Sequence, residues 1–206
     1  MAEPFELYEG ILWEPGSGYF LLDRHLARLG ASARHFGFEV DLPYVRAELL
    51  EFGAELAGPR KVRLELSPDG GLFLEDADVK PSAPVRVARA AEPVDSRDEY
   101  LRHKTSRRGV YEKALAARPR ARDVLLWNER GELTDTCAGN VVLELDGRRK
   151  TPHADAGLLP GTFRAELLAR GEIEEAVLPV ASLERATRAW FINSVRRWCD
   201  LVVEPS

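Results

Sequence analysis

The chain is poor in cysteine, lysine and methionine, and it lacks long apolar runs. Its two cysteines, Cys137 and Cys199, are too few for a disulfide framework and do not have the spacing of metal ligands. No apolar run reaches the ~20 residues that a helix needs to cross a bilayer. The N-terminal residues show neither the basic nor the apolar region of a signal peptide. We therefore expect a reduced, soluble, cytoplasmic protein with no metal site.

A surplus of positive charge is also missing. The 206 residues include 29 lysines and arginines against 34 aspartates and glutamates, which gives a formal net charge of −5. This balance argues against a nucleic-acid or membrane partner and leaves small molecules as the expected ligands. With 45% hydrophobic residues, the chain can form one large domain or two small lobes that share a core.

The hydrophobic pattern predicts short strands among a few helices. Helical spacing predicts helices over residues 22–36, 41–56, 105–117 and 161–169. Asp23 and Gly37 are the expected cap and stop of the first helix. Strands are predicted over residues 5–13, 18–22, 61–66, 72–75, 85–90, 123–127, 141–145, 176–180, 189–193 and 198–203. Hairpin turns at 68–71 and 146–147 favour an α+β architecture over a doubly wound parallel sheet.

One segment in the middle of the chain differs in character from its surroundings. Residues 91–102 are charged, include Pro93 and show no sustained period. Such composition is typical of a connection between lobes. The sequence therefore predicts an N-terminal α/β lobe over 1–90, a linker over 91–103 and a C-terminal lobe over 104–206.

Lysine chemistry has few candidates, because only five of the basic residues are lysines. A lysine that forms an imine must be neutral part of the time, which requires burial, a nearby positive charge or the positive end of a helix. Lys61, Lys80, Lys113 and Lys150 lie in settings typical of solvated residues. Lys104 precedes a predicted helix and two arginines, which favour its neutral form. The alternative interpretation is an ordinary surface lysine.

Two further segments contain residues suited to binding a charged ring. Asp135 lies among small residues shortly before a predicted strand, where a carboxylate can approach a flat ring and keep a pyridine nitrogen protonated. Its alternative role is to cap a turn. Gly161 and Thr162 open a predicted helix, whose backbone N–H groups and dipole favour an anion. The alternative is a helix start with no ligand.

Five segments in order along the chain resemble one family. They are Gly-Tyr-Phe-Leu-Leu-Asp-Arg-His-Leu-Ala-Arg-Leu (18–29), His-Lys-Thr-Ser-Arg-Arg (103–108), Leu-Thr-Asp-Thr-Cys-Ala-Gly-Asn (133–140), Leu-Pro-Gly-Thr-Phe-Arg (159–164) and Phe-Ile-Asn-Ser-Val-Arg (191–196). Together they resemble the class IV aminotransferases, the pyridoxal 5′-phosphate (PLP) enzymes of fold type IV. The likeness is greatest to the 4-amino-4-deoxychorismate lyase branch. It implies a two-lobe, D-amino-acid aminotransferase-like α+β fold, with a small N-terminal α/β lobe and a larger C-terminal lobe built on a pseudo-barrel of strands.

The resemblance also implies a cofactor, PLP, and roles for individual residues. Lys104 would be the catalytic Schiff-base lysine. Arg28 would bind the phosphate, although a helical wheel alone places it on a solvated face. The remaining cofactor contacts would be the phosphate ligands Gly161 and Thr162, the pyridine partner Asp135, with Glu132 as a fallback, and the nearby polar residues Asn193 and Ser194.

Two departures from the family pattern affect the expected reaction. Asp135 stands where the family has a glutamate and is one methylene shorter. The first strand has Glu9-Gly10-Ile11-Leu12 where the family usually has Glu-Thr-Leu-Arg, so the threonine hydroxyl and the arginine are missing. Both changes leave the cofactor site intact in outline, and they bear on what happens to the substrate.

Three functions follow from the resemblance. The leading one is a folate-pathway lyase that converts 4-amino-4-deoxychorismate into 4-aminobenzoate and pyruvate, with Arg107 and Arg108 as candidate carboxylate ligands; both are equally well explained as surface charge. The second is an aminotransferase acting on a branched-chain or D-amino acid. The third, motivated by Gly10, is an inactive PLP-fold binding protein. A homodimer is implied, with aminodeoxychorismate synthase as a candidate partner.

Overall fold

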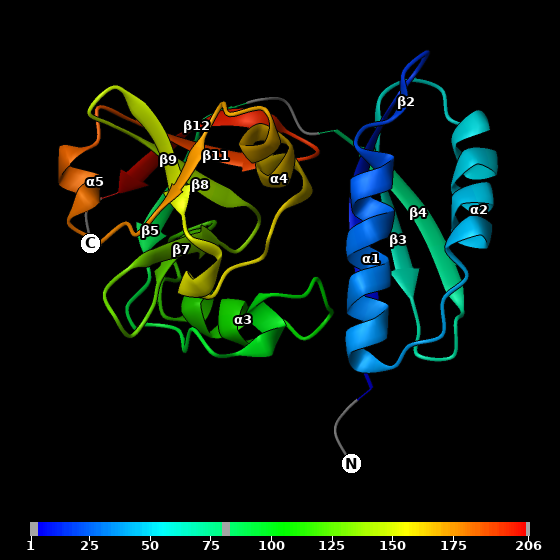
Figure 1. The fold of residues 1–206 in the computed structure, drawn as a ribbon, viewed down its shortest axis with the longest axis horizontal. Helices are drawn as coiled ribbons and strands as arrows, with labels where there is room; N and C mark the ends of the chain where they lie inside the picture. Colours follow the sequence, from blue (N-terminus) through cyan, green and yellow to red (C-terminus); the bar gives the residue numbers. More distant parts are fainter. Residues whose placement is uncertain (1–3, 80–82, 205–206) are drawn as a thin grey trace. The chain divides into compact units, whose positions relative to one another are not determined.

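The computed structural model describes residues 4–79 and 83–204 (Figure 1). The chain divides into two compact units. The first comprises residues 1–80 and 103–107, and the second comprises residues 81–102 and 108–206. In neither is any described helix both long and apolar enough to cross a membrane.

The first unit is a four-stranded antiparallel sheet with two helices. Its strand order is β2-β1-β3-β4, and β1 pairs with β3 along its length, from Leu7 opposite Leu66 to Trp13 opposite Arg60. Leu7, Ile11 and Leu64 lie in the core of this unit, together with residues from both helices. The elements are β1 (Leu7–Glu14), β2 (Gly18–Tyr19), α1 (Leu22–Phe36), α2 (Leu42–Ala54), β3 (Arg60–Leu66) and β4 (Leu72–Asp78).

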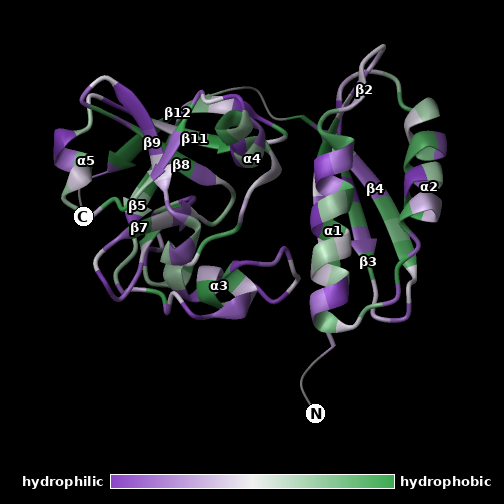
Figure 2. Ribbon diagram, viewed as in Figure 1, coloured by the Kyte–Doolittle hydropathy of each residue, from purple (hydrophilic) through white to green (hydrophobic). Residues whose placement is uncertain are grey.

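Helix α1 buries one face and exposes the other, and Figure 2 shows the corresponding mixture of hydrophobic and hydrophilic residues along it. The helix ends at Gly37, whose φ of 73° is accessible to glycine, as predicted. Asp23 was expected as the cap, and this is wrong. The cap is Leu21, and Asp23 lies within the first turn. An acidic residue there still complements the helix dipole, which explains the similar sequence signal.

The second unit is built on a barrel. Eight strands run in the order β10-β9-β8-β11-β12-β5-β6-β7, and an additional pairing of β7 with β8 closes six of them into a ring. The predicted α+β fold with a barrel of strands is therefore confirmed. The strands are β5 (Val85–Arg89), β6 (Val124–Trp127), β7 (Leu133–Thr136), β8 (Asn140–Leu145), β9 (Arg148–Pro152), β10 (Glu174–Ala176), β11 (Arg188–Asn193) and β12 (Arg197–Glu204).

Short helices connect the barrel strands. They are the 3-10 helices η1 (Glu99–Leu101) and η2 (Ala154–Ala156) and the α-helices α3 (Gly109–Ala116), α4 (Thr162–Ala169) and α5 (Ser182–Arg185). The hairpin between β8 and β9 turns at Asp146 and Gly147, which have φ values of 53° and 73°. This matches the turn predicted from the Asp-Gly pair.

The division of the chain differs from the one predicted. Strand β5 lies in the sheet of the second unit, so the boundary falls near residue 80 and not at residue 90. Residues 91–103 do not form a simple linker, because Val94 and Leu101 are buried and Val94 forms a β-bridge with Asn128. Composition alone suggested a linker because the segment contains few apolar residues. Those few residues are nevertheless packed.

The predicted helix over 105–117 starts four residues late. Helix α3 begins at Gly109, whereas Lys104 to Ser106 run extended beside the start of β1. Tyr8 N donates to Lys104 O at 3.0 Å, and Ser106 N donates to Glu6 O at 2.9 Å. Pairing with a distant strand outweighs the local helical preference of the segment. Lys104 therefore does not lie at a helix N-terminus.

Candidate active site

In the first unit, a buried carboxylate binds two cationic or polar side chains of α1. Glu9 lies on β1, and Arg28 grips it side-on, with Nε to Oε1 at 2.8 Å and Nη2 to Oε2 at 2.5 Å. His25 Nδ1 lies 2.7 Å from the same Oε2. Glu9 faces the core because alternate residues of β1, Leu7 and Ile11 among them, do so. We call Glu9, His25 and Arg28 the Glu9 cluster.

The electrostatics of the Glu9 cluster are decided by the arginine. Burial alone would raise the pKa of the Glu9 carboxyl, but the charges and hydrogen bonds of Arg28 and His25 lower this pKa to about 2. Burial lowers the pKa of His25, more than the neighbouring Glu9 raises it. At neutral pH the cluster is therefore an ion pair of Glu9 with Arg28, and a neutral His25 donates from Nδ1 to the carboxylate.

Lys104 lies in the same unit as Arg28. Its Nζ lies 4.4 Å from the centre of the Tyr8 ring, and its side chain is partly buried. The positive charge of Lys104 helps to lower the pKa of the His25 imidazole. Lys104 therefore lies close enough to the Glu9 cluster to interact with it electrostatically.

The position of Arg28 corrects the interpretation of the helical wheel. Its side chain is only 12% exposed, because Glu9 draws it against the sheet. A helical wheel considers only the positions of apolar residues. It therefore places a charged residue such as Arg28 on the solvent-exposed face, even when the partner of that residue is buried. Of the two predicted environments for Arg28, the solvated face is the wrong one.

In the second unit, Asp135 lies on β7 and is 2% exposed. Its Oδ2 accepts a hydrogen bond from Leu159 N at 3.1 Å. The carbonyl oxygen of Leu159 accepts from Asn140 Nδ2 at 2.8 Å, and Asn140 is the cross-strand partner of Asp135. The backbone N–H and C=O of Leu159, in the loop before α4, are therefore both hydrogen-bonded to side chains of neighbouring barrel strands. We call this arrangement the Leu159 clamp.

The clamp fixes the start of α4. Gly161 is the N-cap residue, and it has no side chain with which to cap the helix. A Cβ on Gly161 would overlap Asn140 Oδ1, so a larger residue here would displace the Asn140 side chain that binds Leu159. Thr162, the first helical residue, is buried, and the first turn of α4 contains no acidic residue. Backbone N–H groups at such a terminus favour an anion.

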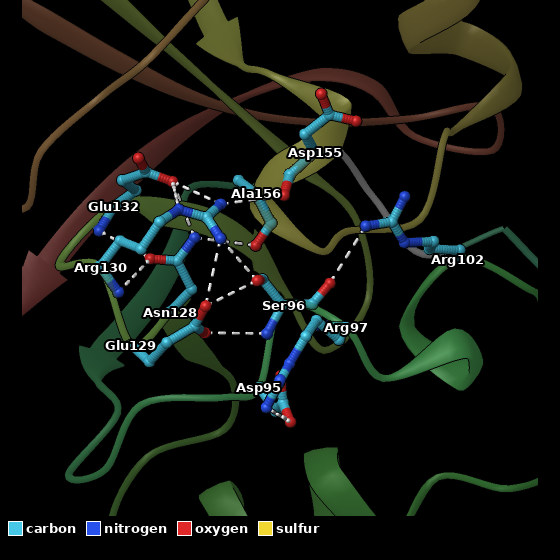
Figure 3. A network of polar contacts seen from close by, with 10 residues as sticks. All are labelled: Asp95, Ser96, Arg97, Arg102, Asn128, Glu129, Arg130, Glu132, Asp155 and Ala156. Carbon is cyan, nitrogen blue, oxygen red and sulfur yellow. Dashed lines mark hydrogen bonds and ion pairs between the residues drawn. The ribbon is translucent and has the colours of Figure 1, made fainter.

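A polar network anchors the chain immediately before this loop (Figure 3). The Arg130 side chain donates to Ser96 Oγ at 2.6 Å, to Glu132 Oε2 at 2.9 Å and to the carbonyl of Asp155 at 2.9 Å. Asn128 Nδ2 donates to the carbonyl of Ala156 at 3.0 Å. Two successive carbonyls of η2 are thus bound, and the loop that leads to α4 departs from a fixed point. We call this the Arg130 network.

Asn193 and Ser194 lie at the end of β11, next to the β7–β8 turn. Asn193 Oδ1 accepts from the backbone N–H groups of Val195 and Arg196 at 3.0 and 2.7 Å, and its Nδ2 donates to Ala138 O at 3.2 Å. Ser194 is buried. The structure therefore collects Asp135, Gly161, Thr162, Asn193 and Ser194 on neighbouring strands and loops of the second unit.

Arg107 and Arg108 are assigned to different units, although they are adjacent in the sequence. Arg107 lies in the first unit, with its guanidinium 4.7 Å from the centre of the Phe5 ring. Arg108 lies in the second unit, where its Nη2 donates to Cys137 O at 2.6 Å. Of the other lysines, Lys80 lies outside the described residues.

Sequence reasoning missed Glu9 and His25 as parts of the site. A signal was present, because Glu9 occupies a core-facing position in the alternation of β1, where a charged residue needs a partner. The two residues that bind it recur on one side of α1, three apart. Glu132, the fallback for Asp135, belongs instead to the Arg130 network. Among the described residues, no cluster of three or more histidine, cysteine or acidic side chains is arranged to hold a metal ion.

Comparison with known proteins assigns the family. The profile of the Amino-transferase class IV family matches residues 6–201. A Schizosaccharomyces pombe protein provisionally named aminodeoxychorismate lyase is 30% identical over 98% of this chain and 92% of its own length. The chain belongs to the class IV aminotransferase family. Members of this family use PLP, so the expected cofactor is confirmed.

Solved structures of the class IV family agree in fold. A Mesorhizobium loti protein provisionally named an amino-acid aminotransferase is 36% identical, covers 97% of this chain and 100% of its own, and superposes with a TM-score of 0.90. The 4-amino-4-deoxychorismate lyase of Pseudomonas aeruginosa is 23% identical, covers 95% of this chain and 82% of its own, and has a TM-score of 0.80. The latter likeness concerns the fold alone.

Proposed function

We propose that this class IV enzyme is a lyase that cleaves 4-amino-4-deoxychorismate to 4-aminobenzoate and pyruvate. The observation that carries the proposal is the 30% identity to the yeast protein provisionally named as such a lyase, which extends over 98% of the chain. The reaction balances without a second substrate, because the atoms of the two products sum to those of the substrate. Formation of an aromatic ring provides its driving force.

The side chains and backbone groups present fit the cofactor. A buried carboxylate, Asp135, suits a protonated pyridine nitrogen. The start of α4 at Gly161 and Thr162 offers backbone donors, and Gly161 lies against Asn140, whose side chain a larger residue would displace. Arg28 supplies a cation for the phosphate, and Lys104 supplies an amine that can react with the cofactor aldehyde. Asn193 and Ser194 are assigned to the surroundings of the ring and phosphate.

Each assigned residue has a distinct task in the reaction. When bound, PLP supplies an electron-withdrawing ring that stabilises negative charge developing on the substrate. Lys104 Nζ takes a proton from the substrate, and the carboxylate of Asp135 holds the proton on the pyridine nitrogen. The Leu159 clamp keeps the Asp135 carboxylate and the start of α4 at a fixed separation.

The remaining assignments concern binding and assembly. We assign the substrate carboxylates to Arg107 and Arg108, because guanidinium groups pair with carboxylates in two-point contacts. A homodimer in the cytoplasm, a place in folate biosynthesis and a partnership with aminodeoxychorismate synthase belong to the same proposal. Light scattering at working concentration measures the mass of the assembly and tests the first of these.

The second candidate function is an aminotransferase acting on a branched-chain or D-amino acid. It is favoured by the 36% identity and TM-score of 0.90 to the Mesorhizobium loti protein provisionally named an amino-acid aminotransferase. Transamination requires the cofactor to carry the amino group between two substrates, and it relies on the carboxylate at the ring nitrogen more heavily than the lyase reaction does. The shorter Asp135 therefore favours the lyase.

One experiment separates the two functions. The PLP-loaded protein is given 4-amino-4-deoxychorismate, and pyruvate is measured with a coupled dehydrogenase; parallel samples contain amino acids with 2-oxoglutarate, and glutamate is measured. We expect pyruvate release and no glutamate. Glutamate formation without pyruvate release would refute the lyase.

We expect Lys104→Ala to lose at least ~10³-fold in rate, because the amine that moves the proton is gone. Borohydride treatment followed by peptide mass mapping is expected to fix the cofactor on Lys104 in the parent protein. Lys113→Ala, on the exposed face of α3, is the matched control and is expected to retain both activity and fixation. Fixation at another lysine would contradict the assignment of Lys104.

A further inference from the structure

The two hydrogen bonds from Arg28 to Glu9 fix the orientation of the guanidinium plane. A guanidinium has five N–H donors. Glu9 takes one from Nε and one from Nη2, in the side-on arrangement. The hydrogens on Nη1 point along the opposite edge of the same plane. Glu9 therefore fixes not only where Arg28 lies but also which of its donors are directed elsewhere.

Glu9 is itself held firmly. Its side chain is 2% exposed, β1 fixes its backbone through full pairing with β3, and His25 Nδ1 lies 2.7 Å from the oxygen that also binds Arg28. His25 is fully buried within α1. A long, flexible arginine side chain is thus attached to a rigid carboxylate, and less rotational entropy is lost when Arg28 binds an anion.

We propose that Glu9 is a positioning residue that holds the Arg28 guanidinium in the orientation in which it binds the cofactor phosphate. This inference rests on the proposed function, in which Arg28 contacts that phosphate. Glu9 acts through Arg28 and does not itself touch the cofactor.

Two effects of Glu9 on phosphate affinity have opposite signs. As a positioning residue it strengthens binding, because an aligned charge-assisted hydrogen bond replaces a disordered one. As a nearby negative charge it weakens binding of an anion. Arg28 already neutralises that charge in a close two-point contact, so we expect the positioning effect to be larger.

Two substitutions separate position from charge. Glu9→Asp keeps the charge, but its shorter side chain cannot hold both Arg28 nitrogens and still reach His25. Glu9→Gln keeps the length and removes the charge, and its amide group cannot accept from both nitrogens. If position dominates, both variants bind PLP more weakly. If charge dominates, Glu9→Gln binds PLP more tightly than the parent protein.

The test compares the dissociation constants of PLP and of pyridoxal, which lacks the phosphate, by the visible absorbance of the bound cofactor. We expect each variant to weaken PLP about ten-fold, the worth of one charge-assisted hydrogen bond, and to leave pyridoxal within about two-fold. A general structural defect would weaken both ligands equally. The matched control is Asp23→Asn, which removes an exposed carboxylate of α1 that binds Arg46 of α2, and it is expected to change neither dissociation constant.

The outcomes distinguish this inference from the proposed function. If the parent protein prefers PLP to pyridoxal and both Glu9 variants keep that preference, the cofactor assignment stands and the positioning role of Glu9 is refuted. If the parent binds neither ligand, the proposed function fails and this inference fails with it. Should one Glu9 variant not fold, the other still gives the comparison.

Discussion

The Glu9 cluster and the Arg130 network use the same chemistry in opposite surroundings. Each centres on an arginine bound to glutamate, but the Arg28 side chain is 12% exposed and that of Arg130 is 43% exposed. Exposed ion pairs are screened by water and salt and contribute little to stability. A buried carboxylate must keep its cation, because removing one partner leaves the other charged and desolvated. The comparison shows that burial, more than the number of bonds, decides how much each arginine matters.

The strongest test of this comparison removes the cation of the buried pair. We expect Arg28→Met to lower the free energy of unfolding by about 3–5 kcal/mol, because Glu9 is left buried without its main partner. Urea denaturation of the cofactor-free protein measures the change. Arg46→Met, on the exposed pair with Asp23, is the control and is expected to have a far smaller effect. A loss below about 1 kcal/mol for Arg28→Met would overturn the buried-pair interpretation.

Acid provides the next test. The pKa of Glu9 is lowered from 4.5 to about 2 in the folded protein, so between these values the unfolded chain binds more protons than the folded one. The contribution of Glu9, about 3 kcal/mol, is therefore fully present above pH ~4.5 and is lost as the pH falls toward 2.

We expect the urea midpoint of the parent protein to fall more steeply across this range than that of Glu9→Gln, which has no carboxyl to titrate. Parallel pH profiles of the two proteins would show that Glu9 does not carry the effect. The exposed acids of the Arg130 network titrate in both proteins and cancel in the comparison.

The smallest effect is expected in the exposed network. Arg130→Gln removes contacts to Ser96, Glu132 and the Asp155 carbonyl, yet water replaces much of what is lost. We expect the thermal midpoint to fall by no more than about 2 °C and the difference to shrink in 1 M salt. A large, salt-independent fall would mean that the network supports the loop before α4 more strongly than its exposure indicates.

Much of the fold could be predicted where the signals are local. The stop of α1 at Gly37 and the Asp146-Gly147 hairpin each depend on a few neighbouring residues, and both occur as predicted. Strand β7 was missed because Leu133–Thr136 is short and contains Asp135, a residue type that favours turns. Its strand conformation comes from the pairings with β6 and β8, which local sequence does not encode.

The candidate site shows the same contrast between local signals and contacts with distant residues. Lys104, Asp135 and Gly161 could be named from motifs, because their residue types are specific. Their surroundings could not. The Leu159 clamp joins Leu159 to side chains 24 and 19 residues away, and the partners of Glu9 lie 16 and 19 residues from it. The start of the helix predicted over 105–117 was wrong for this reason, since the extended segment that replaces its first residues depends on β1.

Residues 103–107 belong to the first unit, while the segments on both sides of them belong to the second. During synthesis, the residues of the first unit therefore emerge from the ribosome as two separate segments. The N–H of Tyr8 lacks its hydrogen-bond acceptor, Lys104 O, until residue 104 has emerged, well after β4 is complete. No single cut in the chain yields the two units intact. A gene fragment that ends near residue 80 encodes a first unit that lacks residues 103–107, and with them Lys104.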